Sequence, residues 1–409
     1  MQVVAVQTVP DDPSARRCTH KQGSLGPKLL FSFLRAKRPG FLHRWRTYGA
    51  VGSMLLVVSV VAFVAPCVAQ EADAGKELPL VWVLSTGGTI SGKGALSTNL
   101  TEYKAGSLLG EELVKGVPEI QQFAKVKVEQ VVNVGSPDIT IANWITLANR
   151  INRIFADDPK VAGVVITHGT NTLEETAYFL NLTVKHDRPV VLVGSMRPAT
   201  AISADGPLNL LNAVRTAASP GARGKGVLIV MNDEINGARD TTKTNTYRVE
   251  TFRAPDLGYL GYVDADQVVF YRASTRRHTV NSEFEIGNVT MLPEVEIAYS
   301  YVQPGGAVIQ ALVASGVKGI VFAGTGAGLL SNSEKLALKQ SLAGRGTKIP
   351  VLVRSSRTGS GRVVGREEYD SLGMIPADTL NPQKARILLM LALTKTSDLK
   401  EIRRMFAEY

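Results

Sequence analysis

The chain has 409 residues, of which 44% are apolar and 20% are charged. This length is sufficient for two domains with sizeable cores, and the composition is ordinary for a globular protein. A net charge of +10 would fit a nucleic-acid partner, but residues 1–70 hold nine Lys or Arg against two Asp. They therefore carry +7 and the other 339 residues only +3, so we expect no nucleic acid to bind.

The first 69 residues form a predicted leader. The segment Arg35–Arg46 is basic, and the uncharged segment Gly49–Gln70 follows it. The small residues Cys67 and Ala69 lie at the −3 and −1 positions of a cleavage between Ala69 and Gln70. This pattern is typical of a secretory signal peptide, which predicts a periplasmic or secreted mature protein. The alternative is an uncleaved membrane anchor, because about twenty apolar residues can span a bilayer.

Both cysteines, Cys18 and Cys67, belong to this leader. The mature chain therefore has no disulfide, no thiolate nucleophile and no cysteine metal site. A phosphate loop of the form G-x-x-x-x-G-K-S/T does not occur either. His168 has no partner at a metal-ligand spacing, and we expect a structural role for it. We therefore expect the protein to work without a metal or a cofactor.

From Leu78 onward, β-branched runs alternate with amphipathic segments, which predicts an α/β fold with mainly parallel sheets. Thr172, followed by Glu175 three residues later, predicts a capping box at the start of one helix. The predicted strands are Pro79–Leu84, Val161–Thr167, Pro189–Val193, Gly226–Met231, Val295–Tyr299, Gly319–Ala323 and Ile349–Val353. The predicted helices lie within residues 139–155, 173–185 and 381–393.

A polar, poorly periodic segment around residues 273–294 ends at a proline-containing turn and predicts a domain boundary. We expect a larger N-terminal domain with a mainly parallel sheet at residues 78–275. A linker is expected at 276–294. A smaller C-terminal α/β domain of flavodoxin-like type is expected at 295–409.

Two predicted strand ends carry similar polar residues. The strand in VWVLSTGGTI ends at Thr86–Thr89, and the strand in VVITHGTNTLEET ends at Thr167–Asn171. Each places a threonine directly after a glycine, where backbone N–H groups can be exposed. By itself, each such end is more often a tight turn, and we expect GTGAG at residues 324–328 to be one. As a pair at the carboxyl edge of a sheet, the two ends favour a site.

A threonine hydroxyl is a poor nucleophile until a base removes its proton. The mature chain has no cysteine and no G-x-S-x-G sequence, so lysine, tyrosine and carboxylates remain as candidate bases. Lys243 lies in the polar segment ARDTTKTNTYR, and desolvation there would lower its pKa and make it a base. The alternative is an ordinary solvated loop lysine.

Six segments closely resemble those of the bacterial type II L-asparaginase family, which includes glutaminase-asparaginases. They are, in chain order, TGGTIS, GSPD, THGTNTLEETAYF, VGSMRPATAISADGPLNL, MNDEINGARDTTKTNT and TLNPQKAR. The resemblance covers about residues 78–409, and it is specific because several long motifs keep their order. It implies that Thr89 is the nucleophile and that Thr170 and Lys243 are the second catalytic threonine and its lysine. Tyr103, in NLTEYKAG, matches the tyrosine of a mobile loop that closes over the substrate.

The resemblance also implies the substrate contacts and the reaction. Ser136 matches a serine that grips the α-carboxylate of the substrate, and Gly88, Asn171 and Glu367 are further substrate-binding candidates. Backbone N–H groups near Gly88 and at Thr170–Asn171 are candidates for an oxyanion hole. The implied reaction is hydrolysis of the side-chain amide of L-asparagine to L-aspartate and ammonia through a threonine acyl-enzyme. The implied assembly is a homotetramer with active sites shared between subunits.

This chain departs from the family pattern at several positions. Asn171 replaces an acidic residue that most members have, so it supplies no charge to the substrate ammonium group or to Lys243. Pro137 stands where many members carry glutamine, and either Glu367 or Glu368 matches the glutamate that supports the loop tyrosine. A disulfide of some members, between the regions of residues 154–158 and 186, is absent.

Three functions therefore remain open. The expected one is L-asparaginase activity. A second is a glutaminase-asparaginase that prefers glutamine or a related amide. The third is a catalytically silent amino-acid-binding protein, which needs polar groups around its ligand but no nucleophile with a base. The combination of Thr89, Thr170 and Lys243 favours an enzyme.

Overall fold

The computed structural model describes residues 77–344, 346 and 349–409. The predicted leader, with its cleavage site and both cysteines, lies outside the described residues. Two main sheets organise the described chain, one of eight strands and one of four. Within the described ranges, no helix is long and apolar enough to span a bilayer.

The eight-stranded sheet has the order β12-β11-β8-β7-β6-β5-β1-β4. Its strands are β1 (Leu80–Gly87), β4 (Lys125–Val134), β5 (Val161–Thr167), β6 (Val190–Val193), β7 (Val227–Met231), β8 (Glu234–Gly237), β11 (Gly261–Val263) and β12 (Val268–Phe270). The five strands from β4 to β7 are parallel, and β8, β11 and β12 add antiparallel pairs at one edge. The carboxyl ends of β1 and β5 therefore lie side by side at one edge of the sheet.

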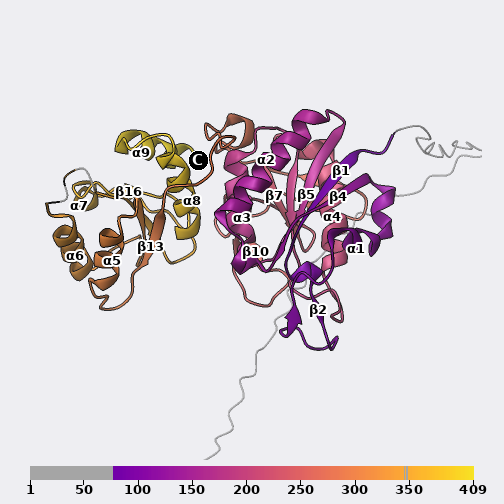
Figure 1. The fold of residues 1–409 in the computed structure, drawn as a ribbon, viewed down its shortest axis with the longest axis horizontal. Coiled ribbons are helices and arrows are strands. Elements are labelled where there is room, and N and C mark those ends of the chain that lie inside the picture. Colours follow the sequence, from indigo (N-terminus) through magenta and orange to yellow (C-terminus); the bar gives the residue numbers. More distant parts are fainter. Residues whose placement is uncertain (1–76, 345, 347–348) are drawn as a thin grey trace, which may run out of the picture. The chain divides into compact units, whose positions relative to one another are not determined.

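Helices cover both faces of this sheet (Figure 1). Helices α2 (Ile141–Asp157) and α3 (Leu173–Thr183) pack on one face, where Val164 and Ile166 of β5 belong to their hydrophobic cluster. Helices α1 (Gly110–Lys115) and α4 (Gly206–Ala218) pack on the other face, where Val165 of β5 contributes. Because β5 is buried on both faces, its sequence is a continuous apolar run rather than an alternating one.

The second sheet has four parallel strands in chain order. Its strands are β13 (Val295–Tyr299), β14 (Gly319–Gly324), β15 (Val351–Ser356) and β16 (Ile375–Pro376). Its helices are α5 (Ala307–Ser315), α6 (Asn332–Leu342), α7 (Glu367–Asp370), α8 (Pro382–Leu393) and α9 (Leu399–Glu408). The predicted fold class is therefore confirmed: a larger α/β part with a mostly parallel sheet precedes a smaller α/β part with a parallel sheet.

The predicted capping box at Thr172 is wrong. Thr172 does precede α3, but its side chain makes no capping hydrogen bond. Its hydroxyl instead donates to the backbone carbonyl of Ser136, at 2.7 Å. The loop that carries Ser136 comes close enough to compete for this hydroxyl, so a local pattern was overridden by a contact between distant residues.

The segment at 276–294 contains only one short helical turn, η5 (Thr279–Asn281), yet it is not simply solvated. Phe284 is 1% exposed, and its ring lies 5.0 Å from the ring of Tyr409. This irregular segment therefore contributes an aromatic side chain to the hydrophobic core.

Arg188 joins the two regions between which some relatives are expected to carry a disulfide. Its guanidinium donates to the carbonyls of Asp158 and Val161, both at 2.8 Å, and to that of Phe155. It also stacks over the Phe155 ring, 4.4 Å from the centroid. A buried cation with carbonyl partners thus holds these regions together without cysteine.

Candidate active site

The two glycine-threonine strand ends meet at their backbones. Strands β1 and β5 are paired up to Ser85 and Thr167. Just beyond them, Gly88 adopts a positive φ of +87°, and a Cβ atom there would lie 2.3 Å from both the N and the Cα of Gly169. Only glycine fits such an approach. Thr89 and Thr170 are therefore the residues that come directly after the two glycines whose backbones are in contact.

Thr89 is paired with the tyrosine of a neighbouring hairpin. Thr89 is 8% exposed and begins the 3₁₀ turn η1 (Thr89–Ser91). Its Oγ1 lies 2.8 Å from the Oη of Tyr103, which belongs to β3 (Tyr103–Lys104). Strand β3 pairs with β2 (Lys93–Gly94), and a Cβ at Gly92 would lie 2.7 Å from the Tyr103 ring. The absence of a side chain at residue 92 thus makes room for the tyrosine.

Thr170 is paired with Lys243. The Lys243 ammonium group donates to Thr170 Oγ1 and to Asn171 Oδ1, both at 2.9 Å. Lys243 lies on β9 (Thr242–Lys243), which pairs with β10 (Phe252–Arg253). Burial lowers the pKa of Lys243, and the negative charge of Glu174 acts against that shift. Lys243 is therefore not an ordinary solvated loop lysine.

Ser136 lies against the second strand end. It is 3% exposed and begins the 3₁₀ turn η3 (Ser136–Asp138), which also contains the exposed Pro137. Its Oγ accepts a hydrogen bond from the backbone N–H of Asn171, at 3.1 Å. The hydroxyl proton of Ser136 has no acceptor among the hydrogen bonds of the described residues, so it can still be donated to a ligand.

Two of the backbone groups expected near an oxyanion hole are already engaged. The N–H of Gly88 donates to the carbonyl of Val134, at 3.1 Å. The N–H of Asn171 donates to Ser136 Oγ, as described above. Among the groups predicted near Gly88 and at Thr170–Asn171, those of Thr89 and Thr170 are therefore the better candidates.

Glu367 is not brought to the other predicted site residues in this chain. It is exposed on α7, and in the part of the chain that the structure describes its side chain makes no hydrogen bond or ion pair. The neighbouring Glu368 forms an ion pair with Lys335 of α6. Neither glutamate therefore contacts Tyr103 within one chain.

His168 is structural, as predicted. It is fully buried, and burial lowers its pKa to about 4, so the ring is neutral. Its Nδ1 lies 2.7 Å from the carbonyl of Gly169, and its Nε2 lies 3.0 Å from the hydroxyl of Thr176. That hydroxyl also accepts from the indole of Trp144, at 2.7 Å. The described residues contain no group of three acidic, histidine or cysteine side chains that could hold a metal ion.

Sequence reasoning missed two polar residues beside the lysine, the buried Glu174 and the half-buried Gln383. Glu174 of α3 accepts a hydrogen bond from the backbone N–H of Lys243, at 2.8 Å. The amide of Gln383, at the start of α8, donates to the other carboxylate oxygen of Glu174, at 2.6 Å. Both residues belong to quoted motifs, LEET and NPQ, but nothing local in those motifs relates one to the other.

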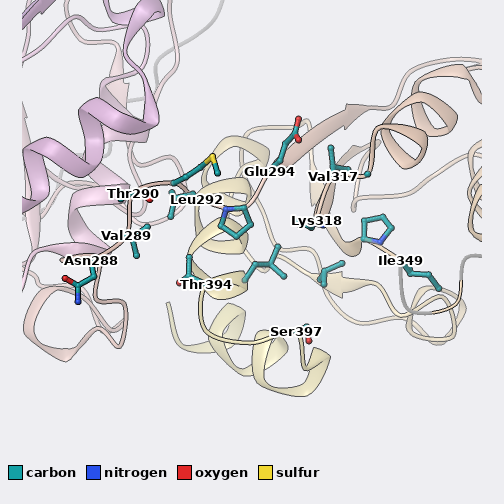
Figure 2. Close-up of a pocket in the computed structure, with 16 residues that line it drawn as sticks. Asn288, Val289, Thr290, Leu292, Glu294, Val317, Lys318, Ile349, Thr394 and Ser397 are labelled. Carbon is teal, nitrogen blue, oxygen red and sulfur yellow. The ribbon is translucent and has the colours of Figure 1, made fainter.

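Two hollows differ in their relation to these residues. A hollow of about 480 Å³ is lined by Asn171, Glu174, Lys243 and Gln383, among others. A larger one, of about 1060 Å³, is lined by residues 288–294, by residues 316–318 before β14, by residues 349–351 at the start of β15, and by Leu393, Thr394 and Ser397 at and after the end of α8 (Figure 2). It contains none of the predicted site residues, so size alone does not locate the chemistry.

A threonine hydroxyl paired with a tyrosine, next to a second threonine hydroxyl paired with a lysine, is an arrangement that can hydrolyse an amide through a covalent intermediate. The fold and these pairs fit a two-domain α/β hydrolase of the threonine-dependent class. Two family models match the chain: "Asparaginase, N-terminal" at residues 80–276 and "Glutaminase/Asparaginase C-terminal domain" at 294–406. The chain therefore belongs to the asparaginase family of amidohydrolases.

Individual relatives agree with this assignment. L-asparaginase 2 of Bacillus subtilis is 50% identical over 339 residues, which cover 83% of this chain and 89% of the relative. A probable periplasmic L-asparaginase of Haemophilus influenzae is 46% identical over 339 residues, 81% of this chain and 94% of the relative. The crystal structure of a probable cytoplasmic L-asparaginase from Campylobacter jejuni has a TM-score of 0.78 at 46% identity, covering 82% of this chain and 100% of that chain.

Proposed function

We propose that this protein hydrolyses the side-chain amide of L-asparagine to L-aspartate and ammonia through a threonine acyl-enzyme. One observation carries the proposal. Two hydrogen-bonded pairs lie next to the contact between Gly88 and Gly169. They are Thr89–Tyr103, at 2.8 Å, and Thr170–Lys243, at 2.9 Å. Membership of the asparaginase family supports the reaction.

In the first half of the reaction, Thr89 Oγ1 attacks the amide carbon of the substrate. Tyr103 accepts the hydrogen bond of the hydroxyl and assists loss of its proton. The C–N bond then breaks, the nitrogen gains that proton and leaves as ammonia, and a β-aspartyl ester of Thr89 remains. In the second half, a water attacks the ester carbon, and its proton returns to Thr89. The balance is asparagine plus water giving aspartate plus ammonia.

The second pair serves the proton transfers of both halves. Lys243, with its pKa lowered by burial, can release and regain a proton through the Thr170 hydroxyl. The N–H groups of Thr89 and Thr170 are our candidates for stabilising the negative oxygen of each tetrahedral intermediate. One such donor is typically worth ~2.7–4 kcal/mol of barrier.

The proposed substrate contacts are Ser136, Gly88, Asn171 and Glu367. Ser136 keeps a free proton for the α-carboxylate, and Asn171 offers an amide rather than a charge to the α-ammonium group. Glu367 has no hydrogen bond or ion pair in the described part of its own chain. We propose, as the family resemblance implies, a homotetramer with shared active sites, in which Glu367 of one subunit completes the site of another.

We also propose the division into a catalytic domain at 78–275, a linker at 276–294 and a second domain at 295–409. The residues matched by the two family models support it. Export with cleavage near Ala69 and Gln70 is proposed from the leader sequence alone. The relatives do not decide the location, because one is named periplasmic and another cytoplasmic.

A preference for L-glutamine remains the alternative within the family, because the matching C-terminal model is described as glutaminase or asparaginase. A silent amino-acid-binding protein is the alternative outside it. The paired hydroxyls argue against that reading, since binding needs neither a nucleophile nor a base.

Ammonia release by residues 70–409, measured with L-asparagine and L-glutamine separately, tests the proposal. Thr89→Val keeps the shape of the side chain without its hydroxyl, and we expect activity to fall by at least ~10⁴-fold. Thr89→Ser keeps the hydroxyl and should retain measurable turnover, while Thr89→Ala should match the valine variant. A folded wild-type protein that released no ammonia from either amide would overturn the proposal.

A further inference from the structure

The lysine of the second pair is held by residues that the reaction described above does not use. Glu174 is 5% exposed, and each of its carboxylate oxygens has a partner. Oε2 accepts from the backbone N–H of Lys243 at 2.8 Å, and Oε1 accepts from the Gln383 amide at 2.6 Å. A buried carboxylate with two directed hydrogen bonds is a rigid acceptor. It therefore fixes the position of the β9 backbone that carries Lys243.

The first turn of α8 holds the same segment from a second point. Lys384, the residue after Gln383, is 1% exposed, and its ammonium group donates to the carbonyls of Arg239 and Thr241. Its backbone N–H is capped by Asn381 Oδ1, at 3.1 Å. Consecutive side chains of α8 thus contact both the carboxylate beside Lys243 and the strand segment that leads to it.

The charge of Glu174 has a larger share in stabilising the Lys243 ammonium group here than it would beside an acidic residue 171, because residue 171 of this chain is an amide. Asn171 Oδ1 accepts from Lys243 but carries no charge. Glu174 is the carboxylate that raises the pKa of Lys243 against the effect of burial. Two other ionisable groups interact with Glu174 electrostatically, Glu175 on α3 and Lys384 on α8. Glu175 in turn interacts with Arg386 on α8, and Lys384 with Arg239 and Asp240 before β9.

We infer that Glu174 is a positioning residue for Lys243, oriented by Gln383, and that it supplies the negative charge that Asn171 lacks. The inference rests on the proposed function for its catalytic consequence. Its structural core, a carboxylate that holds the lysine and stabilises its charged form, does not depend on turnover.

A titration of Lys243 in the intact mature protein tests this directly. The side-chain NMR signal of ¹³C-labelled lysine gives the pKa, and Lys243→Arg assigns the signal by its loss. Removing a nearby opposite charge disfavours the ammonium form, so Glu174→Gln should lower the pKa of Lys243 by about one unit. Glu175→Gln is the matched control: it removes a neighbouring carboxyl group that makes no hydrogen bond to Lys243, and the pKa should stay within ~0.3 unit.

Ammonia release from L-asparagine gives the second readout. We expect kcat to fall by about tenfold in Glu174→Gln, with a smaller change in KM, because the lysine is displaced rather than the substrate site. Gln383→Leu keeps the charge but loses the orienting bond, so kcat should fall while the pKa of Lys243 moves less. Equal pKa and kcat in the Glu174→Gln and Glu175→Gln proteins would overturn the inference. If the wild-type protein released no ammonia but Glu174→Gln still lowered the pKa of Lys243, only the proposed function would be overturned.

Discussion

The two glycine-threonine strand ends begin alike and end in different chemistry. In each, the first threonine is used for structure: Thr86 Oγ1 donates to the carbonyl of Thr167, and Thr167 Oγ1 donates to Ser85, at 2.8 and 3.0 Å. The second threonine is available for reaction. Thr89 meets a phenol, whereas Thr170 meets an ammonium group.

This difference separates two tasks that a single hydroxyl cannot perform together. In the proposed reaction, the phenol partner forms a hydrogen bond with the attacking hydroxyl of Thr89, while the lysine partner can exchange a proton within the reach of Thr170. The two glycines bring the strand ends together at their backbones, and the partner that arrives from elsewhere in the chain distinguishes Thr89 from Thr170. Variants that change only the partner should therefore affect the two strand ends differently.

The largest effect is expected from removing the lysine partner. Lys243→Met keeps much of the side-chain volume but has no proton to exchange, and we expect kcat for asparagine to fall by about 10²–10⁴-fold. Lys339→Met removes an exposed lysine of α6 and should leave kcat unchanged. Steady-state rates of ammonia release, with thermal melting to verify folding, give the comparison. A Lys243→Met protein with wild-type kcat would show that both strand ends work without a base.

A second, smaller effect is expected from separating the two ends at their contact. In Gly88→Ala the new Cβ would lie 2.3 Å from the Gly169 backbone, so the loops must move apart. We expect a loss of about 2–3 kcal/mol in the free energy of unfolding and an activity loss of about 100-fold.

Gly316→Ala is the matched control for this change. Gly316 has a similar φ of +84°, but no atom lies within 4 Å of the added Cβ. Backbone strain alone should cost about 1 kcal/mol there and leave activity intact. Denaturant unfolding and ammonia release, measured on both variants, distinguish strain from contact. Equal losses at the two glycines would refute the role of the Gly88–Gly169 approach.

Features that depend on neighbouring residues are predictable from the sequence, whereas features that depend on contacts between distant residues are not. The strand of Val161–Thr167 is predicted to the residue, because a short, mostly apolar run buried on both faces is a local signal. Strand β4 was missed because its exposed edge position makes its sequence polar and only partly alternating. The Glu174–Gln383 bond joins residues 209 positions apart, so no spacing within either motif could indicate it. The capping box at Thr172 failed for the same reason.

The smallest effect concerns the amide that distinguishes the second strand end of this chain. In Asn171→Asp, a carboxylate would stand 2.9 Å from the Lys243 ammonium group and favour its charged form. Burial already lowers the pKa of Lys243, so the new charge should move that pKa back up, by about one unit. If the neutral amine is the working base, the acidic limb of kcat/KM must move to higher pH by the same amount.

The control for this shift adds the same charge nearby without the contact. Asn245 lines the same hollow, and its side-chain oxygen accepts from the backbone N–H groups of Tyr247 and Arg248, bonds that an aspartate can keep. Asn245→Asp should therefore move the limb much less than Asn171→Asp. Equal shifts would mean that the hollow responds to charge in general. A shift in Asn171→Asp but not in Asn245→Asp would show that the amide of Asn171 itself sets the proton affinity of Lys243. The two strand ends of this chain would then differ in charge as well as in partner.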